Sequence, residues 1–280
     1  MVVSIQLEMA EFTIEPLPID METKYMGFLR EYDFSPGDET IFRWYRKLEG
    51  TNMYVSTDNG NIIATAMSFS FGKTGWLGAI CTHADYRGMG LGKAITQYAI
   101  GRLRNQGAET ILLRASEEGA RLYRKMGFQV SGSYENFFVK SGDFKPYCGK
   151  NIFGINYLSE RHFLLDSEFT GELRKPALSS LPGLTGYELL EGGELRAFIY
   201  PSIGDGIVGM TKEVGFIPDM VQRAMSGRSG KVRTLRGSVL NKHMHELGFE
   251  TNDGARRMVL GKDPIKNKNG IIGTISSSIG

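Results

Sequence analysis

The sequence predicts a mixed α/β protein made of two related units, and three observations support that fold class. The chain has 280 residues, which exceeds the usual span of one hydrophobic core and favours two units of about 140 residues each. Stretches with the spacing of amphipathic helices alternate with short strand-like runs along the chain. Short runs of the first half also reappear, in the same order, in the second half.

The composition is that of an ordinary folded protein. Hydrophobic residues make up 41% and charged residues 23% of the chain, unlike a disordered or fibrous sequence. The net charge of +2 gives no concentrated basic field, so we expect no nucleic-acid partner. Residues 1–10 lack the regions of a secretion signal, and no run reaches the roughly 18 apolar residues of a membrane span. We therefore expect no membrane partner.

Cysteine and histidine content bears on the compartment and on metal binding. Cys81 and Cys148 are the two cysteines, too few for a disulfide framework, which is typical of a reducing compartment. We expect a cytoplasmic protein. His243 and His245 lie two positions apart, hence on different faces of a helix, and no cysteine or carboxylate cluster completes a zinc set with them. We expect no metal, and the sequence does not indicate an oligomeric state.

The first half is predicted to be one mixed unit of helices and strands. Asp58-Asn59-Gly60 contains residues that tolerate the positive φ of a hairpin turn, and Gly107 and Gly127 are placed to end helices. Helices are expected over residues 20–32, 38–48, 91–105 and 118–126. Strands are expected over residues 12–17, 52–57, 61–71, 76–83 and 110–114, with a pair of strands around Tyr134 within residues 128–139.

Three matches between the halves indicate a duplication. Leu112-Leu113-Arg114-Ala115-Ser116 reappears as Thr234-Leu235-Arg236-Gly237-Ser238, and Met126-Gly127-Phe128 reappears as Leu247-Gly248-Phe249. Each copy then runs into a closing strand, over residues 136–139 and 256–260. We predict a first domain of residues 1–142, a linker of residues 143–151 that contains Pro146 and Gly149, and a second, diverged copy of residues 152–280. Residues 271–279 are expected to form a last strand.

A glycine-rich loop joins a predicted strand to a predicted helix. Gly88, Gly90 and Gly92 stand at alternate positions there. Without side chains the backbone can approach an anion closely, and the first N–H groups of the helix at Leu91 have no partner within it. Arg87 and Lys93 flank the loop and can add charged contacts. We expect the loop to bind phosphate; the alternative is a glycine-rich turn without a ligand.

Two other phosphate-binding loops do not fit these residues. A Walker A loop needs glycine where Arg87 stands and serine or threonine where Ala94 stands. A dinucleotide fingerprint that starts at Gly88 needs glycine where Lys93 stands. A nucleotide-binding protein is therefore the weakest of the functional hypotheses.

Residues 79–94, Ala-Ile-Cys-Thr-His-Ala-Asp-Tyr-Arg-Gly-Met-Gly-Leu-Gly-Lys-Ala, resemble the acetyl-CoA-binding motif of the GNAT N-acetyltransferase superfamily. That motif has Gln or Arg, two residues, Gly, one residue, then Gly or Ala, and here it is matched by Arg87, Gly90 and Gly92. Residues 116–128 resemble the second conserved stretch of the family. The resemblance implies a mixed, mostly antiparallel sheet flanked by helices, present here in two copies. The whole chain resembles tandem GNAT proteins whose C-terminal half is degenerate.

The resemblance also implies which residues contact acetyl-CoA. In the family, pantetheine lies between two splayed strands and bonds to an exposed strand edge, while the glycine loop holds the pyrophosphate. Carried over residue by residue, the cofactor contacts are Ile80, Cys81, Thr82, Arg87, Gly88, Met89, Gly90, Leu91, Gly92, Lys93, Ser116, Tyr123 and Lys125. Ser116 stands where many relatives have an Asn that hydrogen bonds to the cofactor, so here the serine hydroxyl would have to make that bond. Lys125 either reaches a phosphate or is solvated.

Tyr123 is the candidate catalytic residue. The family often places a tyrosine here to protonate the departing thiolate, and a phenol with pKa near 10 can do so in a site poor in water. The alternative is that Tyr123 only packs or touches pantetheine. The general base stays open among four residues that can accept a proton directly or through water, namely His83, Asp85, Glu39 and Glu135.

The expected reaction is transfer of acetyl from acetyl-CoA to a primary amine, by direct attack in a ternary complex. The acceptor, a small molecule or a protein amine, stays open. Aromatic residues available to line its pocket are Phe42, Trp44, Tyr45, Tyr134 and Phe137. The second half has no Arg-x-x-Gly-x-Gly before residue 217, and Met244 takes the place of the tyrosine, so we expect no cofactor there. The alternative is a non-catalytic acyl-CoA-binding module whose second domain recruits a partner.

Overall fold

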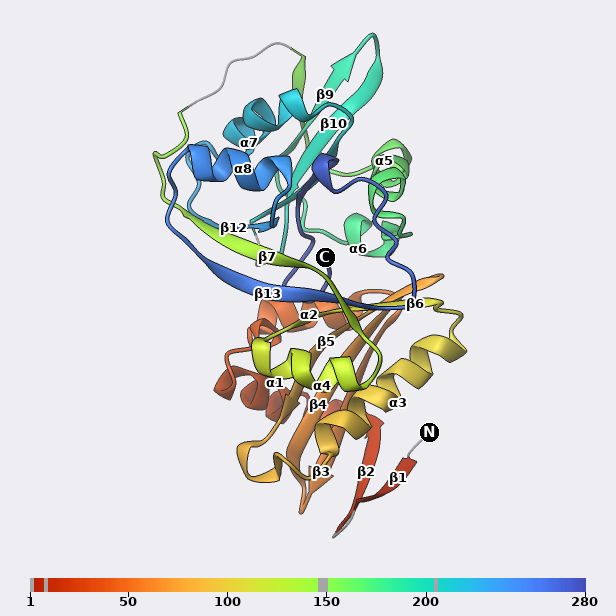
Figure 1. Ribbon diagram of the computed structural model, residues 1–280. Coiled ribbons are helices and arrows are strands. Elements are labelled where there is room, and N and C mark those ends of the chain that lie inside the picture. The colour runs from red at the N-terminus through yellow and green to blue at the C-terminus, as the bar shows by residue number, and fades with distance from the viewer. Residues whose placement is uncertain (1–2, 8–9, 146–150, 204–205) are drawn as a thin grey trace.

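The protein has two stacked halves joined by a pair of long strands. A computed structural model describes residues 3–7, 10–145, 151–203 and 206–280 (Figure 1). The strands form a 9-stranded sheet in the order β1-β2-β3-β4-β5-β6-β13-β7-β12 and a 5-stranded sheet in the order β14-β11-β10-β9-β8. Figure 1 shows β7 and β13 running side by side between the halves.

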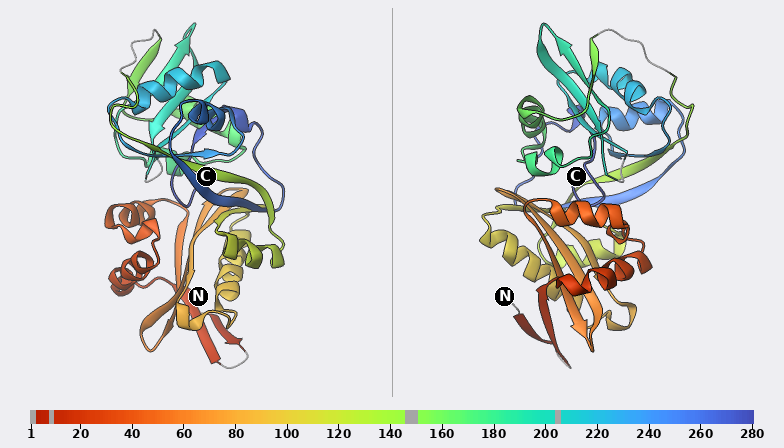
Figure 2. Two further views of the ribbon diagram at one scale, coloured as in Figure 1. Left: turned by 60° about the vertical axis from the view of Figure 1, so that its left-hand side comes forward. Right: turned by 180° about the vertical axis from the view of Figure 1, so that it is seen from behind.

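The elements of the first half follow one another as a mostly antiparallel unit. Its helices are α1 Glu22–Glu31, α2 Glu39–Lys47, α3 Leu91–Asn105 and α4 Glu117–Lys125. Its strands are β1 Val3–Leu7, β2 Ala10–Pro16, β3 Thr51–Asp58, β4 Asn61–Phe71, β5 Thr74–Thr82, β6 Thr110–Ala115 and β7 Gln129–Val139. In Figure 2, α1 and α2 cover one face of this sheet and α3 and α4 the other.

The second half has its own small sheet between two layers of helices. Its helices are α5 Glu160–Thr170, α6 Lys175–Ser179, α7 Ile217–Met225 and α8 Val239–Glu246. The strands of its own sheet are β8 Ile152–Ile155, β9 Gly186–Glu191, β10 Glu194–Pro201, β11 Ile207–Thr211 and β14 Ile271–Gly273. The other two strands of the second half, β12 Gly230–Leu235 and β13 Thr251–Leu260, belong to the 9-stranded sheet.

The two halves exchange their last strands. β13 pairs antiparallel with β6, from Arg256 opposite Ala115 to Leu260 opposite Ile111, and it also pairs with β7. β7 in turn pairs with β12, with Leu235 opposite Tyr134. β13 of the second half therefore gives β6 its partner, and β7 of the first half gives β12 its partner, all within the 9-stranded sheet. The boundaries at residues 142 and 152 stay a prediction, and residues 146–150 of the expected linker lie outside the described residues.

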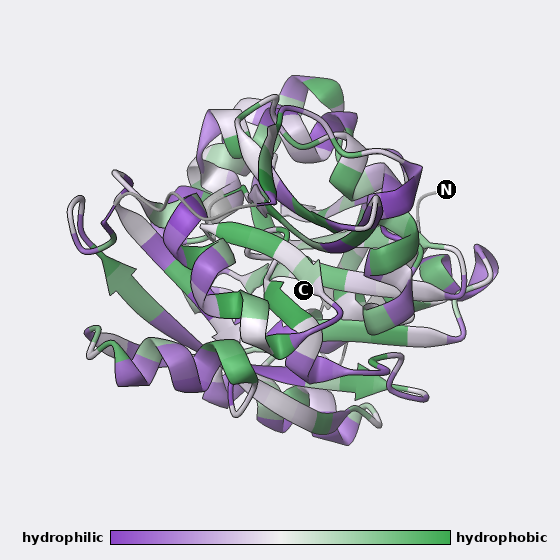
Figure 3. Cartoon of the chain, turned by 90° about the horizontal axis from the view of Figure 1, so that it is seen from above, coloured by the Kyte–Doolittle hydropathy of each residue, from purple (hydrophilic) through white to green (hydrophobic). Residues whose placement is uncertain are grey.

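The buried cores follow the faces of the sheets. One cluster fills the α3 and α4 face of the first half and includes Leu77, Ile95 and Tyr123. A second lies under α7 and α8. The largest runs from the α1 and α2 face of the first half into the second half and includes Ile279. Figure 3 shows hydrophilic colour mainly on the outer helices and turns.

The structure confirms the predicted fold class and corrects two elements. β4 and α3 have the predicted bounds. Residues 129–139 form one strand instead of a pair around Tyr134, because β12 and β13 hydrogen bond along both of its sides and no turn interrupts it. Of residues 271–279, Ile271–Gly273 form a strand, and the chain then leaves the sheet. Strand β1 was not predicted.

We expect neither half to fold alone, because removing β13 leaves buried backbone groups of β6 and β7 unpaired. A fragment of residues 1–145 should show no cooperative unfolding by circular dichroism. Co-expression with residues 151–280 should restore one complex with a cooperative transition. A second fragment of residues 151–250, which lacks β13, is the control and should not restore it. Cooperative unfolding of residues 1–145 alone would contradict the exchange as a folding requirement.

Candidate functional site

Strands β5 and β6 part in the middle of the sheet. They pair in parallel from Thr74 opposite Thr110 to Leu77 opposite Leu113, and there the pairing ends. On the other side of β5, Gly78 pairs with Met67 and Cys81 pairs with Thr65. Two residues of β5 therefore stand opposite one residue of β4, which is a β-bulge. In the described pairing, the edge of β5 beyond Leu77 has no strand partner toward β6, and its backbone groups are open to a ligand.

The bulge depends on an unusual backbone conformation at Ala79. Its φ of 47° is uncommon for a residue with a side chain and costs of order 1 kcal/mol or more. The carbonyl of Ala79 accepts a buried hydrogen bond of 2.8 Å from Thr65 Oγ1, which offsets part of that cost. We define the space between β5 beyond Leu77 and the end of β6 as the strand gap.

The glycine loop lies at the end of β5 and opens α3. Gly88 and Gly90 have φ of 81° and 83°, conformations that glycine adopts without strain. The backbone bond from Ala94 N to Gly90 O, 3.0 Å long, opens the helix, so the N–H groups of the three residues before Ala94 have no acceptor within it. The described first turn contains no acidic residue. The positive end of the helix dipole therefore faces the loop without compensation.

The charged residues of the loop differ in position. The Arg87 guanidinium is held back against the strand end, where Nε donates to Thr82 O at 3.3 Å and the group lies 5.7 Å from the centre of the Tyr32 ring. Lys93 and Met89 are exposed on the surface. A side chain on Gly92 would meet Thr82 Oγ1 at 3.1 Å, so the absence of one lets α3 pack closely on β5.

Tyr123 comes from α4 on the same face of the sheet as the loop. Its side chain is buried against Phe128, with ring centres 5.9 Å apart. Its hydroxyl makes no hydrogen bond to any residue that the structure describes. Burial, with a smaller contribution from the nearby Cys81 thiol, raises the pKa of Tyr123 above its usual value. The hydroxyl is thus held protonated and can donate a proton to a group beside it.

Cys81 occupies the free edge of β5. Burial raises the pKa of its thiol to about 11, against a smaller lowering effect of Arg87. The thiol is therefore neutral at ordinary pH and is a poor nucleophile. Among the expected contacts on this edge, the backbone of Ile80 to Thr82 is what the strand gap leaves accessible, in keeping with a role that does not depend on side-chain chemistry.

Ser116 and Lys125 sit at opposite ends of α4. Ser116 is the N-cap, and its hydroxyl accepts a hydrogen bond of 3.1 Å from Gly119 N. One acceptor site of this serine is therefore used to begin the helix. Lys125 is exposed in the last turn. Leu122, between them, approaches the Cβ position of Gly92 to 3.9 Å, so α4 flanks the glycine loop.

The four candidate bases have other roles or lie in solvent. His83 Nδ1 accepts from Asp85 N at 3.3 Å and so caps a short turn, while the side chain of Asp85 is 84% exposed. Glu39 is paired with Arg43 on the surface of α2. Glu135 is buried and accepts from Asn241 at 2.8 Å, and hydrogen bonding to Asn241 and His245 lowers its pKa despite the opposing effect of burial.

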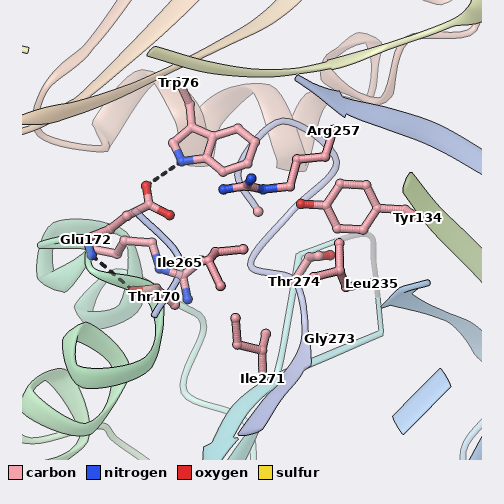
Figure 4. A pocket seen from close by; sticks show the side chains of 12 residues that line it. Trp76, Tyr134, Thr170, Glu172, Leu235, Arg257, Ile265, Ile271, Gly273 and Thr274 are labelled. Atoms are coloured by element: carbon pink, nitrogen blue, oxygen red, sulfur yellow. Dashed lines mark hydrogen bonds between the residues drawn. The ribbon is translucent and has the colours of Figure 1, made fainter. Parts of the chain in front are cut away.

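The opposite face of the sheet holds a small polar cavity that sequence reasoning missed. Its volume of about 20 Å³ is enough for one water molecule. Trp76 donates from its indole nitrogen to Glu172 Oε2 at 2.6 Å, and Arg257 lies beneath the Trp76 ring (Figure 4). Burial raises the pKa of Glu172 against the lowering effect of Arg174. In the sequence, these residues stand out only as charged residues next to apolar ones. That pattern is equally typical of a solvated helix end.

One of the five aromatic residues expected in the acceptor pocket lines this cavity, namely Tyr134. Phe42, Trp44 and Tyr45 lie in the large core under α1 and α2. Phe137 packs instead in the core of the second half, with its ring 5.0 Å from His245. Pairing of β7 with β12 turns the Phe137 side chain toward α8, and its place in an acceptor pocket stays a prediction.

Comparisons with known proteins agree with this fold. Residues 18–128 match the Acetyltransferase (GNAT) family. The chain is 33% identical over 105 residues to the uncharacterized N-acetyltransferase YitH of Bacillus subtilis (strain 168), a match that covers 38% of this chain and 36% of that protein. The chain therefore matches little more than a third of that relative's length.

Solved structures extend the likeness of the fold to the whole chain. A putative acetyltransferase from Pyrococcus horikoshii superposes with a TM-score of 0.79 at 14% identity and 96% coverage of both chains. A tandem GNAT protein from the clavulanic acid biosynthesis pathway gives a TM-score of 0.55 at 12% identity, covering 89% of this chain and 98% of that one.

The solved structures share the fold of this chain. The match to the GNAT acetyltransferase family is confined to residues 18–128, within the first half. Among the residues that the structure describes, no helix is both long and apolar enough to span a membrane. No group of three or more His, Cys, Asp or Glu side chains that could hold a metal ion occurs in the described chain.

Corresponding serines begin α4 and α8 and permit a paired test of capping. Ser116 accepts from Gly119 N, and Ser238 accepts from Asn241 N at 3.2 Å. We expect Ser116→Ala and Ser238→Ala each to lower the free energy of unfolding by about 1 kcal/mol, measured by urea denaturation. Ser141→Ala, at an exposed serine in neither cap, is the control. Equal stability of Ser116→Ala and the unmodified protein would exclude the capping role.

Proposed function

We propose that the protein is an N-acetyltransferase that transfers an acetyl group from acetyl-CoA to a primary amine by direct attack in a ternary complex. The observation that carries this proposal is the strand gap, with the glycine loop and the buried hydroxyl of Tyr123 on one and the same face of the sheet. Acetyl-CoA, when bound, supplies the thioester from which the acetyl group is transferred.

The loop fits the anionic end of that molecule. The free N–H groups at the start of α3 and the positive end of its dipole favour a pyrophosphate. Gly88 and Gly90 hold the loop in a conformation that brings backbone instead of side chains against the ligand. Arg87 would have to leave its contact with Thr82 O to add a charged contact, whereas exposed Lys93 needs no such rearrangement.

The free edge of β5 fits the thioester end. A backbone N–H between Ile80 and Thr82 that faces the strand gap would donate to the carbonyl oxygen as negative charge develops on it, a contribution of about 3 kcal/mol in comparable sites. The amine nitrogen forms a bond to the carbonyl carbon as the carbon–sulfur bond breaks. Tyr123 gives its proton to the departing sulfur, and the proton lost by the amine passes to water, which returns one to the tyrosinate.

One such site per chain is proposed, because the start of α7 differs from that of α3. Asp219 lies in the first turn of α7 and Pro218 stands at its beginning. The carboxylate compensates the helix dipole that a phosphate would need, and it repels anions. The second half is therefore proposed to be a degenerate copy. The two cysteines support a cytoplasmic site of action.

A non-catalytic acyl-CoA-binding module is the second candidate, and one observation favours it. None of His83, Asp85, Glu39 and Glu135 lies free beside the strand gap in the described structure. A protein without a base would bind acetyl-CoA tightly and release coenzyme A no faster with amines than without. Turnover with any member of a panel of small and peptide amines would exclude this candidate.

The loop can be tested by isothermal titration of acetyl-CoA into Gly90→Asp. The added charge and the left-handed backbone should weaken binding at least tenfold. Gly60→Asp is the matched control, because Gly60 has a φ of 74° in an exposed hairpin with open space around it. We expect that control to bind normally. Equal affinity of both variants for acetyl-CoA would remove the loop from the binding site.

Tyr123→Phe tests the acid. We expect kcat to fall about 100-fold or more with little change in the affinity for acetyl-CoA. Since the pKa of Tyr123 is raised above 10, its acid form persists throughout ordinary pH, and Tyr123 should cause no loss of rate up to pH 10. Tyr200→Phe, which removes a hydroxyl bonded to carbonyls in the second half, is the control. Full activity of Tyr123→Phe would exclude Tyr123 as the proton donor to the thiolate.

A further inference from the structure

A buried turn of the second half lies against the strand gap. After β14, residues 276–279 form a tight turn in which Ser276 N donates to Ile279 O at 3.1 Å. The hydroxyl of Ser276 accepts from Ser278 N at 3.3 Å and from Ile279 N at 3.1 Å. We call this segment the 276–279 turn. Figures 1 and 3 show this end of the chain inside the molecule, between the two halves.

The turn is held by side chains of the first half. Arg114 at the end of β6 donates to the carbonyls of Ser276 and Ile279, and the Tyr45 hydroxyl of α2 donates to Ser276 Oγ at 2.9 Å. Ser276 and Ile279 are fully buried. These contacts reach from β6, on one side of the strand gap, to the helix layer that covers it.

The turn touches β5 at the residue where the strands part. A side chain on Gly78 would come within 2.6 Å of Ser278 Cβ, and Gly280 next to the turn packs on the Trp76 ring and near the Tyr134 hydroxyl. Gly78 is the first residue of β5 beyond the last pair with β6. The turn therefore covers the opening of the strand gap on the face opposite α3 and α4.

This position matters for the direction from which an amine can arrive. The glycine loop and Tyr123 lie on the α3 and α4 face, so the donor occupies that face if the proposed function is right. The attacking nitrogen must then reach the thioester carbon through the other face. That path ends at Gly78, where the 276–279 turn now stands.

We propose that the 276–279 turn is a gate that occupies the acceptor site in the resting protein and is displaced when a primary amine binds. This proposal rests on the proposed function. The cavity beside Gly280 is lined by Trp76 and Tyr134, and the carboxylate of Glu172 lies at the indole nitrogen (Figure 4). Because guanidinium groups already lie over both rings, this aromatic surface suits the apolar stem of a neutral primary amine and not a second cation.

One hydroxyl is a common point for the contacts of the turn. Ser276 Oγ accepts three hydrogen bonds, one from the Tyr45 hydroxyl of the first half and two from the backbone N–H groups of Ser278 and Ile279. Each such bond contributes about 1 kcal/mol, so losing the one from the first half alone shifts an equilibrium between an open and a closed turn by about fivefold, and Ser276→Ala removes all three. Backbone bonds from Thr274 N to Ile207 O and from Ile203 N to Ile275 O, both 3.0 Å long, hold the chain before the turn to the second half.

Ser276→Ala tests the gate in the full-length protein. A Trp44→Phe background leaves Trp76 as the single tryptophan, and acrylamide quenching of its fluorescence then reports whether Gly280 and the turn leave its ring. We expect Ser276→Ala to raise the quenching constant and to raise kcat/KM for phenethylamine about fivefold, at unchanged affinity for acetyl-CoA. Ser180→Ala in the same background is the matched control, because that hydroxyl donates to Ala177 O, away from the gap.

The outcomes separate the gate from the proposed function. Unchanged quenching of Trp76 in Ser276→Ala overturns the gate, whichever amine serves as acceptor. Lower kcat/KM with a normal Tm also overturns it, because the turn would then be a fixed wall of the site. Failure of acetyl-CoA to bind the unmodified protein would instead overturn the proposed function. Tyr45→Phe, which removes one bond to the turn without changing the turn itself, should act in the same direction as Ser276→Ala.

Discussion

Reciprocal pairing of the last strands is the constraint on which the rest of the structure depends. β6 has β13 of the other half along one edge, and β12 has β7, so the buried backbone groups of both halves are paired only in the joined molecule. The same pairing fixes β6 in place and leaves β5 free to turn away from it. The second half is thus a structural part of the site, whether or not it binds a ligand.

The bulge at Ala79 converts that continuous sheet into a site with two different faces. One face presents the glycine loop, the start of α3 and the hydroxyl of Tyr123. The other presents Trp76 and Gly78 to the core of α1 and α2 and to the second half. A single left-handed residue, stabilised by the Thr65 hydroxyl, therefore separates two different faces that meet at the strand gap.

Features that depend on neighbours in sequence could be predicted, and features that depend on distant partners could not. α3 and β4 were predicted with their observed ends because hydrophobic period and glycine signals are local. The glycine loop was predicted from glycines at alternate positions between a strand and a helix, and the role of Tyr123 from a resemblance of short stretches. Strand exchange leaves no local trace, which is why β7 was mistaken for two strands. Trp76, Glu172 and Arg257 become a cluster only through burial between the halves.

The halves differ in the parts that no backbone pairing constrains. β12, α8 and β13 keep the order of β6, α4 and β7, since losing any of these strands would leave the partner half with open edges. The start of a helix does not have to pair with a strand of the partner half. The start of α7 could therefore acquire Asp219 and Pro218, whereas α3 has glycine and free N–H groups there. Residues 276–279 follow the same logic. They belong to no complete ladder, and they are therefore free to lie in the first half, against the strand gap that the exchange itself created.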